Sequence, residues 1–392
     1  MRRVLVLALT VLLAVLAWRS AYLSYWRSQD SSLAPSAIAA DPMLKVRDFD
    51  KFASHPDQFS AHATAIARNA QTALRSEPLQ AVAMRQLGMV AAAPRGGTGI
   101  EYFMAAERIS RRELIAQLML IEQTAMDDDI AATLAHYDRV LLVYSASGQN
   151  LFPVLAKALP DMDVRAALGK YVARPWALDF LSNAIDLGAD PASVTELMAD
   201  LKMQIPPNDR DRITTAVIRQ LLTRGHFSLA GDFVKVSHSG NPIDVDQIAM
   251  TPATSDARLA QLAWNFVNDD AFEVALDSSD RLTVRISSEK SGMVAERMTL
   301  LAPGDYLFTQ AVGYDAATPP VRLQWSVRCL EAASSTEIWK QSLPITPGQT
   351  TYRSAFTVPQ TCAAQSWRLT ATADETQFES TASISNLALA KR

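Results

Sequence analysis

Five polar side chains alternate with apolar residues in the last third of the chain, and their chemistry suits oxygen-rich ligands. They are Arg285, Arg322, Gln324, Arg328 and Arg368. A guanidinium group holds a carboxylate through two parallel hydrogen bonds, and an amide both donates to and accepts from hydroxyl groups. If their strands adjoin, these side chains form one polar sheet face suited to sugar hydroxyls or uronate carboxylates. The alternative interpretation, an ordinary solvated sheet face, stays open.

Aromatic side chains in the same region are further candidates, because sugar C–H groups stack on aromatic planes. Trp325 shares its strand face with Val327, and Trp367 alternates in phase with Leu369, so both are expected in the core. Trp339 has polar neighbours in STEIWKQS and is the best candidate for an exposed ligand-binding aromatic.

Motifs for metal binding and nucleophilic catalysis are missing from the sequence. The five histidines lack H-x-x-x-H and H-E-x-x-H spacing, and no G-x-S-x-G occurs. His136, close to Asp138, is expected to be a solvated or capped helix residue. We therefore expect no metal, no cofactor and no enzymatic activity. A pair of carboxylates distant in sequence, as in a glycan-processing enzyme, remains an alternative.

Cys329 and Cys362 are the only cysteines of the chain. In an oxidising compartment they are expected to form a disulfide, which would close a loop of about 34 residues and contribute roughly 3–4 kcal/mol. Two reduced core thiols are the alternative.

Residues 1–26 combine Arg2 and Arg3 with an apolar run from Val4 to Trp18. The run spans about 22 Å as a helix, against about 30 Å for a bilayer core, which favours a signal peptide. Aromatic and arginine residues follow it where a cleavage site needs small residues, which favours an uncleaved anchor. We predict a single-pass inner-membrane protein with the bulk of the chain in the periplasm.

The remaining chain has an ordinary globular composition, with 49% hydrophobic residues and a net charge of -4, which argues against nucleic-acid binding. Residues 27–45 are read as a linker because they show no hydrophobic period. Residues 46–237 show helical periodicity; for example, Leu79, Ala83, Leu87 and Val90 fall on one face of a single predicted helix. A second linker is predicted over 238–254.

Residues 255–392 switch to a period of two, as in RLTVRIS and VRLQWSVRCL. Further strands, including YLFTQAV, YRSAFTV and SWRLTATA, are separated by turn residues at short intervals. This spacing is typical of an antiparallel β-sandwich. The predicted fold class is therefore multidomain α plus β, with an N-terminal membrane helix, an α-helical solenoid of stacked short helices and a C-terminal antiparallel β-sandwich.

Two resemblances accompany these patterns. EYFMAAERISRRELIAQLMLIEQTAMDDDIAATLAHYDRVL resembles degenerate tetratricopeptide repeats, with Leu87-Gly88, Tyr137 and Val140-Leu141 at the family's spacing. LAPGDYLFTQAV, SAFTVPQTCAAQSWRLTATA and SISNLALAKR resemble the jelly-roll sandwiches of carbohydrate-binding modules, over about residues 255–390.

The resemblances imply a non-catalytic accessory protein of cell-envelope polysaccharide assembly or export. Its TPR-like helical domain is expected to bind an envelope protein partner, and its jelly roll an acidic polysaccharide or a protein. A pure structural scaffold that binds no sugar is the main alternative.

Overall fold

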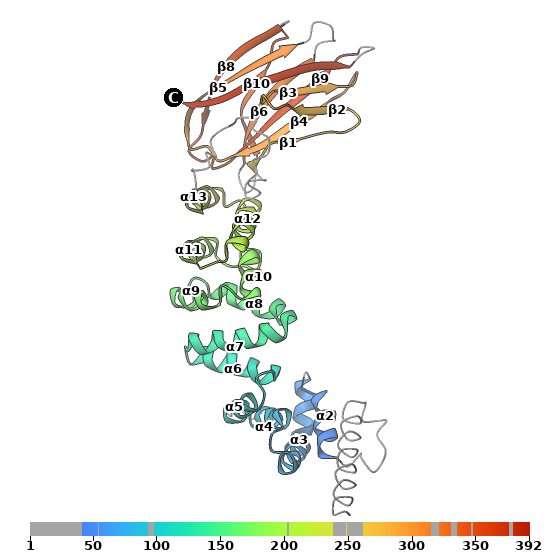
Figure 1. Cartoon of the computed structure of the whole chain (residues 1–392), viewed down its shortest axis with the longest axis vertical. Coiled ribbons are helices and arrows are strands. Elements are labelled where there is room, and N and C mark those ends of the chain that lie inside the picture. The colour runs from blue at the N-terminus through green and yellow to red at the C-terminus, as the bar shows by residue number, and fades with distance from the viewer. Residues whose placement is uncertain are drawn as a thin grey trace, which may run out of the picture. The chain divides into compact units, whose positions relative to one another are not determined.

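The computed structural model describes residues 41–53, 55–92, 98–201, 204–237, 248, 262–314, 321–330, 335–345, 348–375 and 379–392. The chain divides into two compact units, Met1–Leu151 and Phe152–Arg392. The described residues of the first unit are helical, and those of the second form helices followed by two β-sheets (Figure 1). The fold is thus α plus β. Of the predicted linker 238–254, only Ile248 lies within the described residues.

The predicted single-pass inner-membrane and periplasmic localisation is corrected by the structure. Among the described residues, no helix combines the length and the apolar character that a membrane span requires. The 21-residue helix α3 (Pro56–Ser76) is long enough, but it carries Asp57, Arg68 and Arg75. Segment 1–26, on which the prediction was based, lies outside the described residues.

The first unit is a series of helices in which each packs on the next. They are α2 (Pro42–Asp50), α3, α4 (Ala81–Ala92), α5 (Ile100–Ile109), α6 (Leu114–Met126), α7 (Ile130–Val143) and the short η2 (Ser145–Ser147). Helix α2 begins inside the predicted linker 27–45, which corrects that boundary. Its start is fixed by Pro42 in the first turn and by Asp41, whose side chain accepts a hydrogen bond from Met43 N at 2.8 Å.

Helices α4 and α5 approach each other closely at Gly88. A Cβ atom at this position would lie 2.8 Å from Cε1 of Phe103, which is fully buried. The predicted apolar face of this segment needs one correction, because α4 begins only at Ala81. Leu79 precedes the helix and is 80% exposed, so it does not share a buried face with Ala83.

A buried arginine connects three elements of the first unit. Arg85 of α4 is 1% exposed and forms ion pairs with Asp50 of α2 and with Glu113, which directly precedes α6. Its Nε lies 3.0 Å from Glu113 Oε1. Burial raises the pKa of Glu113, while the Arg85 charge acts in the opposite direction. Removing Arg85 would leave Glu113, whose side chain is 16% exposed, without the charge that compensates it.

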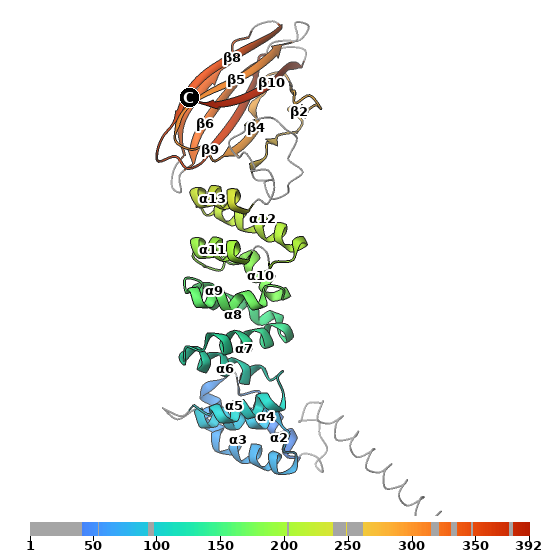
Figure 2. The same cartoon turned by 60° about the vertical axis from the view of Figure 1, so that its left-hand side comes forward.

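The second unit continues with helices. They are α9 (Met162–Leu168), η3 (Gly169–Tyr171), α10 (Pro175–Asn183), α11 (Pro191–Leu201), α12 (Pro207–Thr223) and α13 (Phe227–Ser237), preceded by α8 (Gly148–Ala158), which crosses the boundary between the units. Figure 2 shows α12 beside α13, and α13 also packs on α11. Proline starts three of these helices, where its missing N–H costs nothing. The predicted helical character of 46–237 is confirmed for the described residues.

The predicted antiparallel β-sandwich is also confirmed. Sheet A has the strand order β1 (Asn265–Phe266), β4 (Ser291–Thr299), β9 (Gln365–Ala373), β6 (Val321–Leu330) and β7 (Ser335–Ser342). Sheet B has the order β2 (Phe272–Leu276), β3 (Leu282–Ile286), β10 (Ser380–Lys391), β5 (Gly304–Tyr314) and β8 (Gly348–Val358). Figure 1 shows β5, β8 and β10 in one layer and β6, β9 and β4 in the layer behind it.

The core of the sandwich lies between the two sheets and is aromatic. Trp325, Trp367 and Phe308 are all fully buried, which confirms the predicted core positions of both tryptophans. The indole N–H of Trp325 donates to Gln310 Oε1 at 2.7 Å, and that of Trp367 donates to Thr299 Oγ1 at 3.1 Å. Both indoles therefore satisfy their one donor inside the core.

His136 of α7 differs from its sequence-based prediction as a solvated or capped side chain. It is only 7% exposed, and its Nδ1 lies 2.6 Å from Gln117 Oε1 and 3.1 Å from Arg139 Nη1. Glu107 of α5 is 3.8 Å away. Burial lowers the pKa of His136, partly offset by the Glu107 charge.

The lowered pKa of His136 predicts a pH-dependent stability of the first unit. Below the ordinary histidine pKa of 6.5 the unfolded chain binds a proton that the folded chain binds less readily. The free energy of unfolding should therefore be at its full value above that pH and should decrease as the pH drops below it. We expect His136→Gln to reduce this dependence in urea unfolding followed by circular dichroism. His62→Gln, at an exposed position of α3, is the control, and coincident profiles for wild type and His136→Gln would contradict the prediction.

The predicted disulfide between Cys329 and Cys362 is present, with Cα atoms 5.5 Å apart. It joins β6 to the segment that precedes β9, and both cysteines are buried. Its two ends are 33 residues apart in sequence, so its loss frees a long loop in the unfolded state.

Replacing both cysteines by alanine should lower the free energy of unfolding by about 3–4 kcal/mol, the loop-closure entropy of a cross-link of this length. Guanidinium unfolding of the full chain measures this loss. Wild-type protein, denatured without reductant, should expose no thiol to a labelling reagent, and labelling of two thiols per chain would show that the bridge is not formed.

Candidate functional site

Thirteen side chains, all polar except Met298, point away from the core on β4, β9, β6 and β7 and make a surface that we call the outer face of sheet A. They are Glu296, Met298, Arg322, Gln324, Ser326, Arg328, Glu337, Lys340, Ser342, Ser366, Arg368, Thr370 and Thr372. The alternation of β6 and β9 produces this surface, because their other residues fill the core. Four of the six predicted ligand-binding residues lie here.

The register of the strands arranges these residues in rows across the sheet. One row contains Thr370, Gln324 and Ser342; the next contains Glu296, Arg368, Ser326 and Lys340. A third row contains Met298, Ser366, Arg328 and Glu337. Neighbouring strands are about 4.8 Å apart, so the first two rows present hydrogen-bonding groups at short, regular intervals, whereas the third includes the apolar Met298 and the buried Ser366.

Hydrogen bonds and ion pairs fix much of the outer face of sheet A. Arg368 Nε lies 2.7 Å from Glu296 Oε1, which also accepts a hydrogen bond from Ser366 Oγ at 2.9 Å. Gln324 Nε2 donates to Ser342 Oγ at 2.8 Å. Because these contacts hold the side chains before any ligand arrives, binding would immobilise little further.

Arg322 is also paired, with Asp374 at the end of β9. With Asp374 included, the outer face of sheet A contains the cations Arg322, Arg328, Lys340 and Arg368 and the acids Glu296, Glu337 and Asp374. One net positive charge remains. The surface is therefore polar and nearly neutral rather than strongly basic.

Arg285 is not on this face. It lies on β3 of sheet B and forms an ion pair of 3.0 Å with Glu273 on the neighbouring β2. The prediction of one face containing all four arginines is corrected on this point. Alternation within a strand determines the side on which a residue lies, but it does not determine the sheet that the strand joins.

Trp339 also differs from its prediction as an exposed aromatic. It is half-buried on β7 and packs on the core, 6.0 Å from the Trp367 ring and 5.6 Å from the Phe356 ring between centroids. Its Nε1 donates to Ser354 Oγ at 3.2 Å. Trp339 thus packs at the edge of the sandwich between β7 and β8 and is not the exposed aromatic that its polar neighbours predict.

Several residues of the surface were not singled out from the sequence. Ser326, Ser366 and Thr370 fall on the same strand faces as the predicted arginines, so the alternation already contained this signal. Glu296 had no such signal, because its partner Arg368 is 72 residues away. Within the described ranges, no group of three or more histidine, cysteine, aspartate or glutamate side chains is arranged to hold a metal ion.

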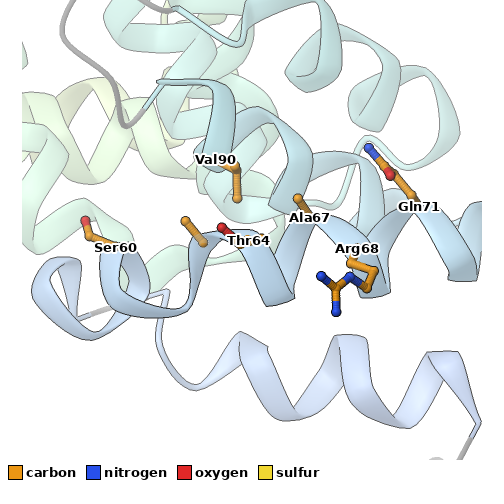
Figure 3. A pocket seen from close by; sticks show the side chains of 7 residues that line it. Ser60, Thr64, Ala67, Arg68, Gln71 and Val90 are labelled. Atoms are coloured by element: carbon orange, nitrogen blue, oxygen red, sulfur yellow. The ribbon is translucent and has the colours of Figure 1, made fainter.

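A second candidate surface lies in the first unit. A groove of about 630 Å³ runs along α3 and is lined by Ser60, Ala63, Thr64, Ala67, Arg68, Gln71 and, from α4, Val90. Figure 3 shows the α3 side chains in line, with Val90 directed at them from the neighbouring helix. The floor is small and apolar, and Arg68 supplies the one charge among the lining residues.

Comparisons with known proteins add little beyond this geometry. No family model and no curated protein matches the chain. Among solved structures, it is similar to a CBM4 protein (10% identity, TM-score 0.24, covering 31% of this chain and 78% of that one). It is also similar to TmCBM61 in complex with β-1,4-galactotriose (11%, 0.24, 33% and 88%) and to a family 16 carbohydrate-binding module-2 (15%, 0.25, 36% and 99%). These TM-scores are low, so functional proposals rest on the surfaces described above.

Proposed function

We propose that this protein is a non-catalytic accessory protein that binds a glycan through the outer face of sheet A. The supporting observation is the ordered polar surface, in which rows of amide, hydroxyl and guanidinium groups are already held in place. Sugar rings present many hydroxyl groups, each of which can donate and accept. A pre-ordered set of donors and acceptors binds such a ligand with a low entropic cost.

The same contacts favour binding over catalysis. Glycoside hydrolysis needs two carboxyl groups about 5–9 Å apart that are available to the substrate. Of the three acids on or beside this surface, Glu296 and Asp374 are each engaged by an arginine, which leaves Glu337 as a single carboxylate rather than a pair. The role of Glu296 and Asp374 is to orient Arg368 and Arg322, which supports a binding module rather than a glycan-processing enzyme.

A variant pair tests this proposal. Gln324→Ala combined with Ser326→Ala removes an amide and a hydroxyl from the centre of the surface. With about 0.5–1.5 kcal/mol for each hydrogen bond, glycan affinity should fall about tenfold. The full chain is assayed on an immobilised array of neutral polysaccharides and polyuronates.

The matched control is Gln349→Ala combined with Thr351→Ala, an exposed amide and hydroxyl on β8 of sheet B. This pair should bind as the wild type does. Wild-type protein that binds no polysaccharide on the array, or an equal loss in both pairs, would leave the pure scaffold as the better interpretation.

The proposal has a second half, in which the helices bind a protein partner. The groove along α3 supports it, because a floor of Ala63 and Ala67 admits a helix or extended segment close to the backbone. No carboxylate of the described residues pairs with Arg68, so an acidic side chain of the partner fits there. Such a protein would link a polymer to a protein, as an accessory of polysaccharide assembly or export does.

Site-specific photocrosslinking in cells tests the groove. A photoreactive amino acid at Thr64 should give a discrete crosslinked protein product, and the same residue at Leu142, which is exposed on α7, should not. Ala67→Trp fills the groove and should abolish the Thr64 product while the helical circular dichroism is retained. Equal products from both positions, or a product that survives Ala67→Trp, would argue against a partner in this groove.

A further inference from the structure

The four cations of the outer face of sheet A are not equivalent. Arg368 and Arg322 are committed to Glu296 and Asp374. Arg328 and Lys340, in contrast, form no ion pair with any described residue. These two side chains are therefore the ones available to an acidic group of a ligand.

Arg328 keeps its charge uncompensated although an acid is close by. Glu337 is its cross-strand neighbour on β7, but the register shifts between Val327 and Arg328, and no ion pair forms between the two side chains. Such a bulge changes the direction of side chains on either side of it. The Nε of Arg328 is covered and lacks a hydrogen-bond partner, while the residue as a whole is half-buried. A ligand would contact its terminal nitrogens.

Lys340 and Arg328 flank a hydroxyl group. Ser326 lies two residues before Arg328 on the same face of β6 and directly across from Lys340 on β7. On the other side Ser326 faces Arg368, which is held by Glu296. A ligand oxygen above Ser326 would thus meet one hydroxyl and two free cations.

We infer that Arg328, Lys340 and Ser326 form a subsite for one carboxylate, so the glycan carries isolated uronic acid residues. This inference rests on the proposed glycan-binding function of the same face. A guanidinium holds a carboxylate more specifically than an ammonium does, so Arg328 is the main contact and Lys340 a supporting charge.

The charge of the surface argues for one acid group rather than a run of them. With Glu296, Glu337 and Asp374 on or beside the same face, only one net positive charge is left for the ligand. A polymer with a carboxylate on every sugar would place further negative charges on a surface with one net positive charge and with the carboxylate of Glu337 nearby, which costs free energy. A polymer with one uronate per repeat can place its carboxylate at Arg328 and neutral sugars elsewhere.

Three probes of matched chemistry test the subsite with the full chain. They are a polysaccharide with one glucuronic acid per repeat, its carboxyl-reduced form, and polygalacturonate, each titrated by isothermal calorimetry. Wild-type protein should bind the first most tightly. Arg328→Ala should weaken that binding about tenfold, within the range of a charge-assisted hydrogen bond. The affinity of Arg328→Lys should lie between those of the wild type and Arg328→Ala.

The carboxyl-reduced polymer isolates the pairwise interaction. Its affinity should be lower for the wild type and unchanged by Arg328→Ala, because the partner of the guanidinium is gone. Arg285→Ala, an exposed arginine of sheet B, is the matched control and should change neither affinity. Urea unfolding of every variant verifies that the fold is retained.

The outcomes separate this inference from the function on which it rests. Equal wild-type affinity for the acidic and the carboxyl-reduced polymer, or tightest binding of polygalacturonate, would overturn the uronate subsite and leave glycan binding intact. An equal loss on both polymers in Arg328→Ala would assign Arg328 to the surface in general and would also overturn it. No binding of any polymer would overturn the proposed function and the subsite together.

Discussion

Trp367 is the residue on which the arrangement of the sandwich depends. Its ring meets four other aromatic rings, with centroids 5.2 Å away at Phe308, 5.5 Å at Phe356, 6.0 Å at Trp339 and 6.3 Å at Trp325. These residues come from both sheets, so the indole fixes the position of one sheet over the other. Aromatic pairs at these distances contribute about 0.5–1.5 kcal/mol each beyond the area that they bury.

The position of Trp367 in β9 also determines what lies outside. Its neighbours Ser366 and Arg368 must point to the opposite side of the strand, where both contact Glu296. The core and the outer face of sheet A are therefore two consequences of one register. A slip of one residue would bury Arg368 and expose the indole, so the core protects the order of the candidate site.

Much of this organisation could be predicted from the sequence because it is local. The sandwich could be predicted from a period of two in several segments separated by turns. In β6 and β9 the same period predicted the core positions of Trp325 and Trp367 and the outward direction of Arg322, Arg328 and Arg368. The disulfide was predicted for an oxidising compartment, where Cys329 and Cys362, the only cysteines of the chain, had only each other as partners.

What could not be predicted depends on contacts between distant segments. Arg285 alternates as the other arginines do, and only the pairing of β3 with β10 and β2 places it in sheet B. Trp339 lies among polar residues, yet an edge strand with a bulge turns it toward Phe356. His136 is buried because Gln117 and Glu107 arrive from neighbouring helices, which its own helix does not reveal.

The ion pairs of the outer face of sheet A change the chemistry of its arginines without removing it. A guanidinium has five N–H donors, and a carboxylate such as that of Glu296 uses only some of them. A paired arginine can therefore still donate to a sugar hydroxyl, while its charge is already balanced and no longer attracts a second carboxylate. Arg322 and Arg368 are thus suited to neutral sugars, and Arg328 to an acid group. The distribution of Glu296, Asp374 and Glu337 around these arginines, rather than the number of arginines, sets the chemistry of the ligand that this surface fits.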